Sequence, residues 1–182
     1  MHFSHHVKLP TISKFMKDIV FGANDGIVTT FAVVSGFNGA SLNSTDAMAL
    51  SVSVVLLFGL ANLFSDGVAM GLGNYLSYST DLGTIEHVTK KDRKTPFLSA
   101  LMIFLAFMLF GFVPLIPYVF NIGDNQTKFL LAIIFSTIAL LILGIFRWRL
   151  TFDNFRKSVG EILLLGGTAA LVAYIVGTFF KV

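Results

Sequence analysis

The sequence predicts an all-α integral membrane protein with five transmembrane helices in a single domain, residues 1–182. Composition is the first reason: 55% of the 182 residues are hydrophobic and only 13% are charged, whereas soluble domains carry about 25% charged residues. The mean hydropathy of +0.81 is likewise typical of a membrane protein. The second reason is that apolar segments long enough to cross a bilayer, which takes roughly 20 residues, alternate with short polar connections. These segments lie at 18–40, 47–76, 96–120, 129–146 and 159–180.

Helices are predicted for these segments because they lack the two-residue alternation of a barrel strand. In lipid, a helix also satisfies its backbone polar groups internally. The connections are too short for a second domain. Before residue 18 there is neither an apolar core nor a small-residue cleavage site, so we expect no removable signal peptide.

The basic residues predict the orientation. Of the 13 Lys and Arg residues, all but Lys128 and Lys181 fall on the side that holds the N-terminal segment and the second and fourth connections. Loops rich in Lys and Arg stay in the cytosol. We therefore expect a cytosolic N-terminus and a C-terminus on the far side.

Polar residues interrupt the first segment, DIVFGANDGIVTTFAVVSG at 18–36. Asp18 and Asp25 lie seven residues apart and share a helix face, and Asn24 precedes Asp25. Burying an ionisable residue inside a membrane costs at least a few kcal/mol of free energy, so such a residue is by default a candidate for a functional role. The alternative is an interhelical hydrogen bond that only joins close-packed helices.

The second segment carries a polar stripe in four-residue steps: Asn62, Asp66, Met70 and Asn74. Such steps keep side chains on nearly one helix face. If the first two segments are antiparallel neighbours, Asp25 lies level with Met70, with Asp66 and Asn74 within one turn. At about 1.5 Å per residue, this level is roughly 10 Å from the cytosolic end.

The remaining segments are less polar. No Asp, Glu, Lys, Arg or His occurs at 97–120 or 129–146, so the third and fourth segments are expected to be a lipid-facing scaffold. Glu161, near the start of the fifth segment, is interpreted either as a proton relay or as a side chain reaching for the interface, and the second interpretation is favoured.

Small residues predict close helix contacts. Gly22 and Gly26 of the first segment are expected to give the second segment room to approach. Gly67 and Gly71 form a similar small-residue pair in the second segment. A further series of small residues consists of Ala61, Ser65, Ala69 and Gly73. Faces of this kind join helices within one chain or between two chains, so a homodimer with a pathway between its protomers is expected.

The ligand types indicate a divalent transition metal. Carboxylate and amide oxygens favour hard cations, whereas a thioether is soft. A set of Asp25, Asp66, Asn62 and Met70, with Asp18 toward the cytosol, suits Fe²⁺, and Mn²⁺ would accept its oxygens. An open site would also admit Co²⁺, Ni²⁺ or Zn²⁺. Met70 can equally be a packing residue.

Several classes of function are excluded or disfavoured. The chain has no cysteine, so disulfides and thiolate sites are absent. Its pI near 9.3 reflects scattered basic residues rather than a patch for nucleic acid. Asp25-Gly26 and Asp66-Gly67 would allow an intramembrane aspartyl protease, and a non-transporting membrane scaffold is a further alternative. We expect no enzyme and no tightly bound cofactor.

The segments DIVFGANDGIVTTFAVVSG, LANLFSDGVAMGLGNYLS and RKTPFLSALMIFLAFMLFGFVPLIPY together closely resemble the vacuolar iron transporter family, also called the nodulin-like or cross-complementer-of-calcium-sensitivity family. The resemblance implies a five-span dimer that moves Fe²⁺ or Mn²⁺ out of the cytosol by metal/proton antiport, along a pathway between the first and second spans at the dimer interface. It also implies that Asp25 and Met70 are metal-site residues and that Asp18 lies at the cytosolic entrance. Whether Asp25 and Met70 pair within one chain or across the dimer stays open.

The chain departs from that family's larger members. Asn62 and Asn74 stand where related sequences have Glu, and Asp66 is expected to supply the missing carboxylate. The connection at 77–95 is too short for the cytosolic metal-collecting domain. There Asp81, Glu86 and His87 are interpreted as a solvated loop in preference to a remnant docking site. The short form favours a prokaryotic plasma membrane over a vacuolar one.

Overall fold

The computed structural model describes residues 11–41, 52–84, 95–150 and 154–180, with side chains from residue 15 onward. In these ranges every regular element is helical. The elements are α1 (Thr11–Ser41), α2 (Val52–Gly83), α3 (Thr95–Gly111), the 3-10 turn η2 (Val113–Leu115), α4 (Ile116–Val119), α5 (Asn125–Leu150) and α6 (Phe155–Thr178). Five segments are long and apolar enough to cross a membrane: Phe15–Ser41, Val52–Gly83, Thr95–Val119, Asn125–Leu150 and Phe155–Thr178. The predicted fold class is confirmed.

Helices α2 and α5 extend several residues beyond the spans predicted for them. The second span was expected to end at Leu76, but α2 continues to Gly83, because no Gly or Pro interrupts the polar turns that follow the apolar run. The start of that prediction, 47–51, lies outside the described residues. The fourth span was expected at 129–146, whereas α5 covers Asn125–Leu150, because Asp124 caps its first turn and its basic last turn follows the apolar stretch.

The third span is interrupted, which the sequence analysis did not predict. After Gly111 the chain forms the η2 turn and the short α4. Pro114 and Pro117 explain the break, since proline has no N–H to donate to the preceding turn and disfavours helical geometry in the residue before it. The segment therefore ends in a kinked and partly buried cap that packs against α5.

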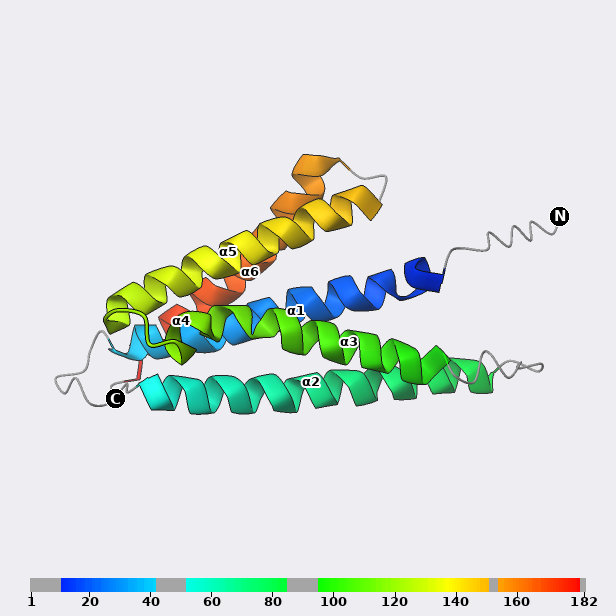
Figure 1. Cartoon of the computed structure of the whole chain (residues 1–182), viewed down its shortest axis with the longest axis horizontal. Coiled ribbons are helices and arrows are strands. Elements are labelled where there is room, and N and C mark those ends of the chain that lie inside the picture. Colours follow the sequence, from blue (N-terminus) through cyan, green and yellow to red (C-terminus); the bar gives the residue numbers. More distant parts are fainter. Residues whose placement is uncertain (1–10, 42–51, 85–94, 151–153, 181–182) are drawn as a thin grey trace.

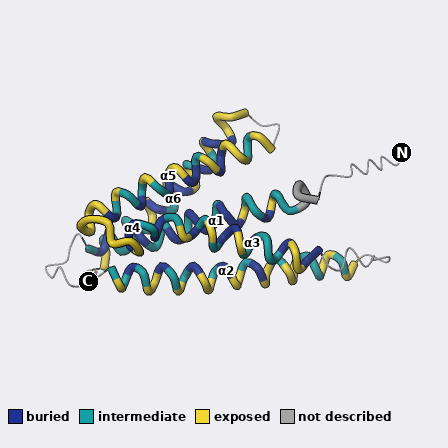
Figure 2. The backbone as a smooth tube through the Cα atoms, in the orientation of Figure 1, coloured by how far each residue is buried: buried dark blue, intermediate teal, exposed yellow. Residues whose placement is uncertain are grey.

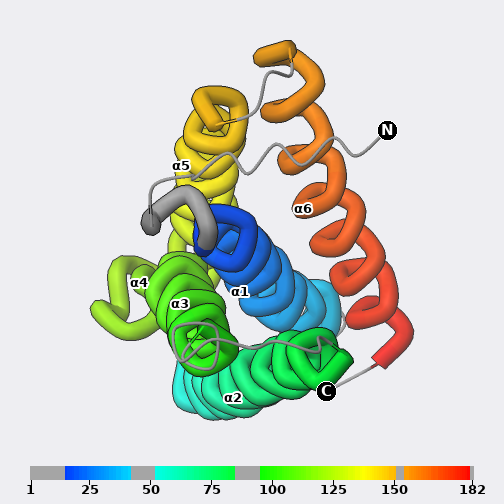
Figure 3. The backbone as a smooth tube through the Cα atoms, turned by 90° about the vertical axis from the view of Figure 1, so that its right-hand side faces the viewer, coloured from blue at the N-terminus to red at the C-terminus, as the bar shows by residue number. Residues whose placement is uncertain are grey.

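Helix α1 runs through the centre of the bundle, with α2, α3, α5 and α6 around it (Figure 3). Successive spans alternate in direction, so the start of α1, the end of α2 and the start of α6 lie toward one end of the molecule (Figure 1). We call this end the basic end, because Lys17, Arg147, Arg149, Arg156 and Lys157 belong to it. It corresponds to the side predicted to be cytosolic.

The close neighbour of α1 at the basic end is α3. A Cβ atom added to Gly22 would lie 2.5 Å from the carbonyl oxygen of Ile103, and one added to Gly26 would lie 2.4 Å from that of Phe107. The prediction that these glycines admit the second span was therefore wrong, because α3 takes that position. The predicted lipid-facing third span is lipid-facing on one face only. Phe97, Leu105 and Leu109 of α3 are exposed, whereas Ser99, Ile103 and Phe107 are buried.

Toward the opposite end, α1 packs directly on α6. A Cβ atom on Gly39 would lie 2.2 Å from the carbonyl oxygen of Tyr174, and one on Gly177 would lie 2.0 Å from that of Gly36. The two backbones touch here because no side chain separates them. Helix α6 is thereby held along the length of α1.

Helix α2 packs on α3 through a stripe of buried residues in four-residue steps, Val55, Gly59, Leu63, Gly67 and Gly71. Its other face is exposed in the single chain (Figure 2), and the small residues Ala61, Ser65, Ala69 and Gly73 all lie there. Apart from the adjacent backbone of α2, no atom of the described residues lies within 4 Å of a Cβ added to Gly73. Within the described part of one chain, nothing covers this small-residue face at Gly73.

Candidate functional site

Asp25 lies on the face of α1 that is turned toward α6, and it is half-buried. It lines a cavity of about 620 Å³ together with Asn24, Val28, Thr168 and neighbouring apolar residues of α6. Asp66 lies on α2, and the charges of the Asp25 and Asp66 carboxylates act on each other. That the two residues share one site, as the depth argument predicts, stays a prediction.

Asp66 is oriented by its own helix. The Nδ2 atom of Asn62 donates a hydrogen bond of 2.8 Å to Oδ2 of Asp66. Because one carboxylate oxygen accepts this amide proton, the other oxygen is left for a further donor or a cation. Asn62 also lines a cavity of about 550 Å³ with Phe58, Gly36 and residues of α6.

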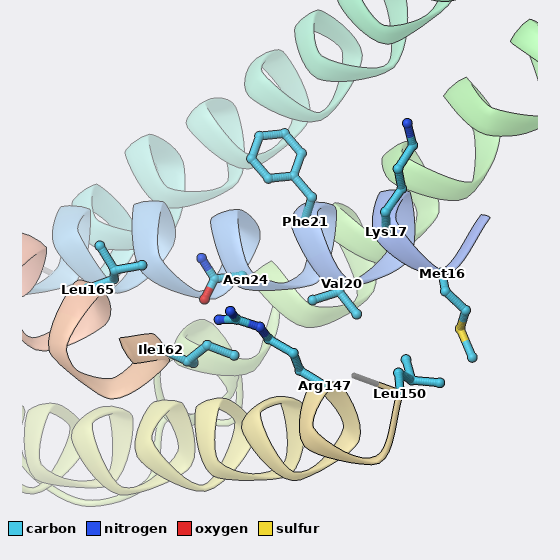
Figure 4. A pocket seen from close by; sticks show the side chains of 9 residues that line it. All are labelled: Met16, Lys17, Val20, Phe21, Asn24, Arg147, Leu150, Ile162 and Leu165. Carbon is cyan, nitrogen blue, oxygen red and sulfur yellow. The ribbon is translucent and has the colours of Figure 1, made fainter. Parts of the chain in front are cut away.

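A third cavity, of about 430 Å³, opens at the basic end between α1, α5 and α6. Figure 4 shows Asn24 and Arg147 pointing into it from α1 and α5, with Ile162 beside them. Asn24 and Leu165 line both this cavity and the Asp25 cavity. Ala173 lines both the Asp25 cavity and the Asn62 cavity. The three cavities therefore follow one another along α1 and α6.

Met70 lies in a different environment from Asp25. It is partly buried and packs against an apolar cluster that includes Val34, Leu63 and Phe107. Its role as a metal ligand stays a prediction, and so does its pairing with Asp25 within or between chains.

Asp18 belongs to a hydrogen-bonded chain of three helices. Its side chain is only 4% exposed and accepts a hydrogen bond from the hydroxyl of Ser99. The Nδ2 atom of Asn74 in turn donates to Ser99 Oγ at 2.9 Å. Asp18 is thus enclosed between α1, α2 and α3, and its predicted role at an entrance stays a prediction.

Sequence reasoning missed Ser99, because it treated the third span as apolar scaffold. The signal was present: Ser99 is the only hydroxyl between Pro96 and Gly111 in a run of apolar residues. A single hydroxyl of this kind on a buried helix face usually has a hydrogen-bonding partner on a neighbouring helix.

Glu161 forms an ion pair with Arg147, with 2.8 Å between Oε2 and Nη2. The pair joins α6 to α5 at the basic end and gives Glu161 a structural partner. Asp81 lies exposed in the last turn of α2. Glu86 and His87 lie outside the described residues.

The described side chains include no group of three or more His, Asp or Glu residues placed to hold a metal ion. Around Asp25 one chain offers the carboxylate of that residue, together with the amide of Asn24 and the hydroxyl of Thr168. Oxygen donors of this kind bind hard and borderline divalent cations. A few oxygen donors in place of a closed cage suit an ion that must bind and leave.

Comparison with known proteins gives a family match over most of the chain. The model of the VIT family matches residues 16–95 and 81–178. Similar proteins include the vacuolar iron transporters of Toxoplasma gondii, 28% identical over 99% of this chain and 78% of the relative, and of Plasmodium falciparum, 25% identical over 91% and 82%. Vacuolar iron transporter 1 of Oryza sativa is 24% identical over 95% of this chain and 88% of the relative.

The alignments also show a difference in length. The two family matches overlap at residues 81–95, from the last turn of α2 to the start of α3. The alignment with the Toxoplasma protein extends over 246 positions, more than the 182 residues of this chain. That relative therefore carries residues that this chain lacks.

Proposed function

This chain belongs to the VIT family and is a metal transporter of the membrane, and on that premise we propose that it exports Fe²⁺ and/or Mn²⁺ from the cytosol. We propose further that export is coupled to proton uptake and that the pathway lies at the interface of a homodimer. The relatives named vacuolar iron transporter support iron as the cargo.

The observation that carries this proposal is the position of Asp25. Its carboxylate lies inside a transmembrane helix, lines a cavity of about 620 Å³ and is within electrostatic range of Asp66. Two neighbouring carboxylates in a low-dielectric region repel each other unless a cation or a proton lies between them. The arrangement therefore favours binding of a divalent ion.

Proton coupling follows from the same chemistry. A carboxylate must be deprotonated to bind a metal, so metal binding releases protons and proton binding releases metal. If Asp25 and Asp66 bind the ion on the cytosolic side and protons on the far side, exchange of one for the other gives antiport. No separate proton-carrying residue is required.

The dimer is supported by the surface of α2. Its small-residue face at Ala61, Ser65, Ala69 and Gly73 is exposed in one chain, and small residues of this kind let membrane helices approach closely. The polar stripe of Asn62 and Asp66 adjoins this face. A second copy placed there would bring a second pair of carboxylates near the first.

The named relatives are eukaryotic and are called vacuolar, so they give no support to the predicted prokaryotic plasma membrane. The short α2–α3 connection is the argument that remains for that membrane. The aspartyl protease alternative is set aside, since the named relatives are transporters and not enzymes.

Uptake into proteoliposomes tests the proposal. Fe²⁺, Mn²⁺, Co²⁺, Ni²⁺ and Zn²⁺ are offered singly and in competition, with and without a pH gradient. We expect saturable transport of Fe²⁺ or Mn²⁺ that a proton gradient of the correct sign accelerates. Absence of transport for every metal would refute the function, and transport indifferent to the gradient would refute the antiport.

A further inference from the structure

We infer that Asn24 and Thr168 are two further oxygen ligands of the transported ion and that they complete, with Asp25, a site between α1 and α6. This inference rests on the proposed transport of a divalent cation. It adds α6 to the ion pathway, which the sequence analysis placed between the first two spans.

The first observation is an amide oxygen without a partner. The Oδ1 atom of Asn24 is fully buried and has no hydrogen-bond partner among the residues that the structure describes. Most buried side-chain polar atoms have a partner, and an exception calls for a bound water, an ion or a functional role. Asn24 lies between the cavity at the basic end and the Asp25 cavity and lines both. Its side chain is thus a wall that the two cavities share.

The second observation concerns Thr168 on α6, which lines the Asp25 cavity from the opposite wall. Its hydroxyl donates to the carbonyl oxygens of Leu164, at 2.8 Å, and Leu165, at 3.0 Å. A threonine hydroxyl has one proton and two lone pairs. Because the proton is committed to the helix backbone, Thr168 has only lone pairs to offer to the cavity.

The polar groups of this cavity consequently share one property. Asp25 and Thr168 present acceptor oxygens, and Asn24 adds an amide oxygen that lacks a donor. The rest of the wall is apolar: Val28, Leu165, Ala169, Val172 and Ala173. A cavity whose side chains are rich in oxygen acceptors, with one negative charge, is complementary to a cation. Its volume of about 620 Å³ leaves room for an ion that keeps part of its water.

The positive charge nearby is compensated. Lys17 and Arg147 line the basic-end cavity on the other side of Asn24. Glu161 binds the guanidinium of Arg147 at 2.8 Å, and the ammonium of Lys17 lies over the Tyr78 ring, 5.7 Å from its centroid. A cation moving from the basic end would therefore pass a paired charge, meet the Asn24 oxygen first, and then reach Asp25 and Thr168.

The test uses full-length protein in proteoliposomes and Mn²⁺ as the probe, with Mn²⁺ affinity measured by calorimetry and the KM for uptake measured in parallel. The blocking variants are Asn24→Leu and Thr168→Val. The conservative variants are Asn24→Asp and Thr168→Ser, which keep an oxygen at each position. The matched control is Thr137→Val, because Thr137 is also exposed and also donates to its own helix, to Ile133 at 2.7 Å, but lies on α5.

We expect each blocking variant to weaken Mn²⁺ binding and to raise the KM by about tenfold or more, the loss typical of a removed ligand or supporting group at a metal site. The conservative variants should stay near the wild type, and so should Thr137→Val. Should Asn24→Leu fail to fold, Asn24→Asp and the Thr168 pair decide the question, because they change little volume.

Wild-type affinity in both Thr168→Val and Asn24→Leu, alongside loss of binding in Asp25→Asn, would overturn this inference and leave the proposed function intact. Equal loss in the conservative and blocking variants would also overturn it, since shape and not oxygen would then matter. Failure of the wild-type protein to bind or move Mn²⁺ and Fe²⁺ would instead refute the proposed function itself.

Discussion

Ser99 donates a hydrogen bond from its hydroxyl to Oδ2 of Asp18, and this bond joins α3 to α1 between two buried side chains. Asn74 of α2 donates to the same hydroxyl oxygen. One small side chain therefore connects three helices at the basic end.

Replacing Ser99 by Ala should lower the free energy of unfolding by about 1–3 kcal/mol, because it removes the hydrogen-bond partner of a buried carboxylate and of a half-buried amide. The measurement is the thermal midpoint of purified protein in detergent. The matched control is Ser136→Ala, since the Ser136 hydroxyl is also buried but has no hydrogen-bond partner. An equal effect of the two substitutions would contradict the importance of the hydrogen bond.

Gly26→Ala tests the close approach of α1 and α3. The added methyl group would lie 2.4 Å from the carbonyl oxygen of Phe107, so the helices must separate, and we expect a loss of about 1–3 kcal/mol. Gly167→Ala is the control, because its methyl group would meet nothing within 4 Å and alanine favours a helix by about 1 kcal/mol. Similar thermal midpoints for the two variants would argue against this packing.

Asn62 and Asp66 are predicted to act as a unit in metal binding. Asn62→Ala removes the amide that orients the Asp66 carboxylate and should weaken Mn²⁺ affinity by about tenfold. In a double-mutant cycle with Asp66→Ala, the Asn62 substitution should have little further effect. Fully additive losses would show that Asn62 does not act through Asp66.

Asp124 lies outside the spans, and its carboxylate is predicted to make the stability of the protein depend on pH. The backbone N–H of Thr127 donates to its carboxylate at 3.1 Å, and hydrogen bonds from Thr127 hold the pKa of Asp124 below its ordinary value of 3.8. Because the folded pKa is the lower one, the stabilisation is present above pH 3.8 and is lost as the pH falls through the folded pKa.

Substitution of Asp124 by Ala should therefore lower the thermal midpoint at pH 7 and have less effect as the pH falls below about 3.8. Asp124→Asn keeps an N-cap side chain but cannot titrate at this position, so its midpoint should lack this pH-dependent contribution. A difference between wild type and Asp124→Ala that persists unchanged at pH 2.5 would contradict the carboxylate's role.

The number of spans followed directly from composition and segment length. The neighbours of each helix did not, because glycine faces show that a close contact exists without identifying the partner. Gly22 and Gly26 were assigned to the second span, and the structure places α3 against them. The break at Pro114 also lay within a continuous apolar run, where hydropathy alone gives no warning.

The site residues likewise divide into those that the sequence reveals and those that only the structure reveals. Asp25 and Asp66 stand out in the sequence because a charge inside a membrane segment is costly. Asn24 and Thr168 do not stand out, since uncharged polar residues are common in such segments and only the cavity between α1 and α6 relates them to Asp25.

The most direct test of the central claim is uptake of Mn²⁺ and Fe²⁺ into proteoliposomes that contain wild-type protein or the Asp25→Asn variant. The control is Asp124→Asn, which removes an acidic side chain outside the spans. Asparagine keeps the size and one oxygen of aspartate but removes the charge. The account predicts that Asp25→Asn folds as the wild type does and transports neither metal, while Asp124→Asn transports both normally. Undiminished uptake by well-folded Asp25→Asn would contradict it.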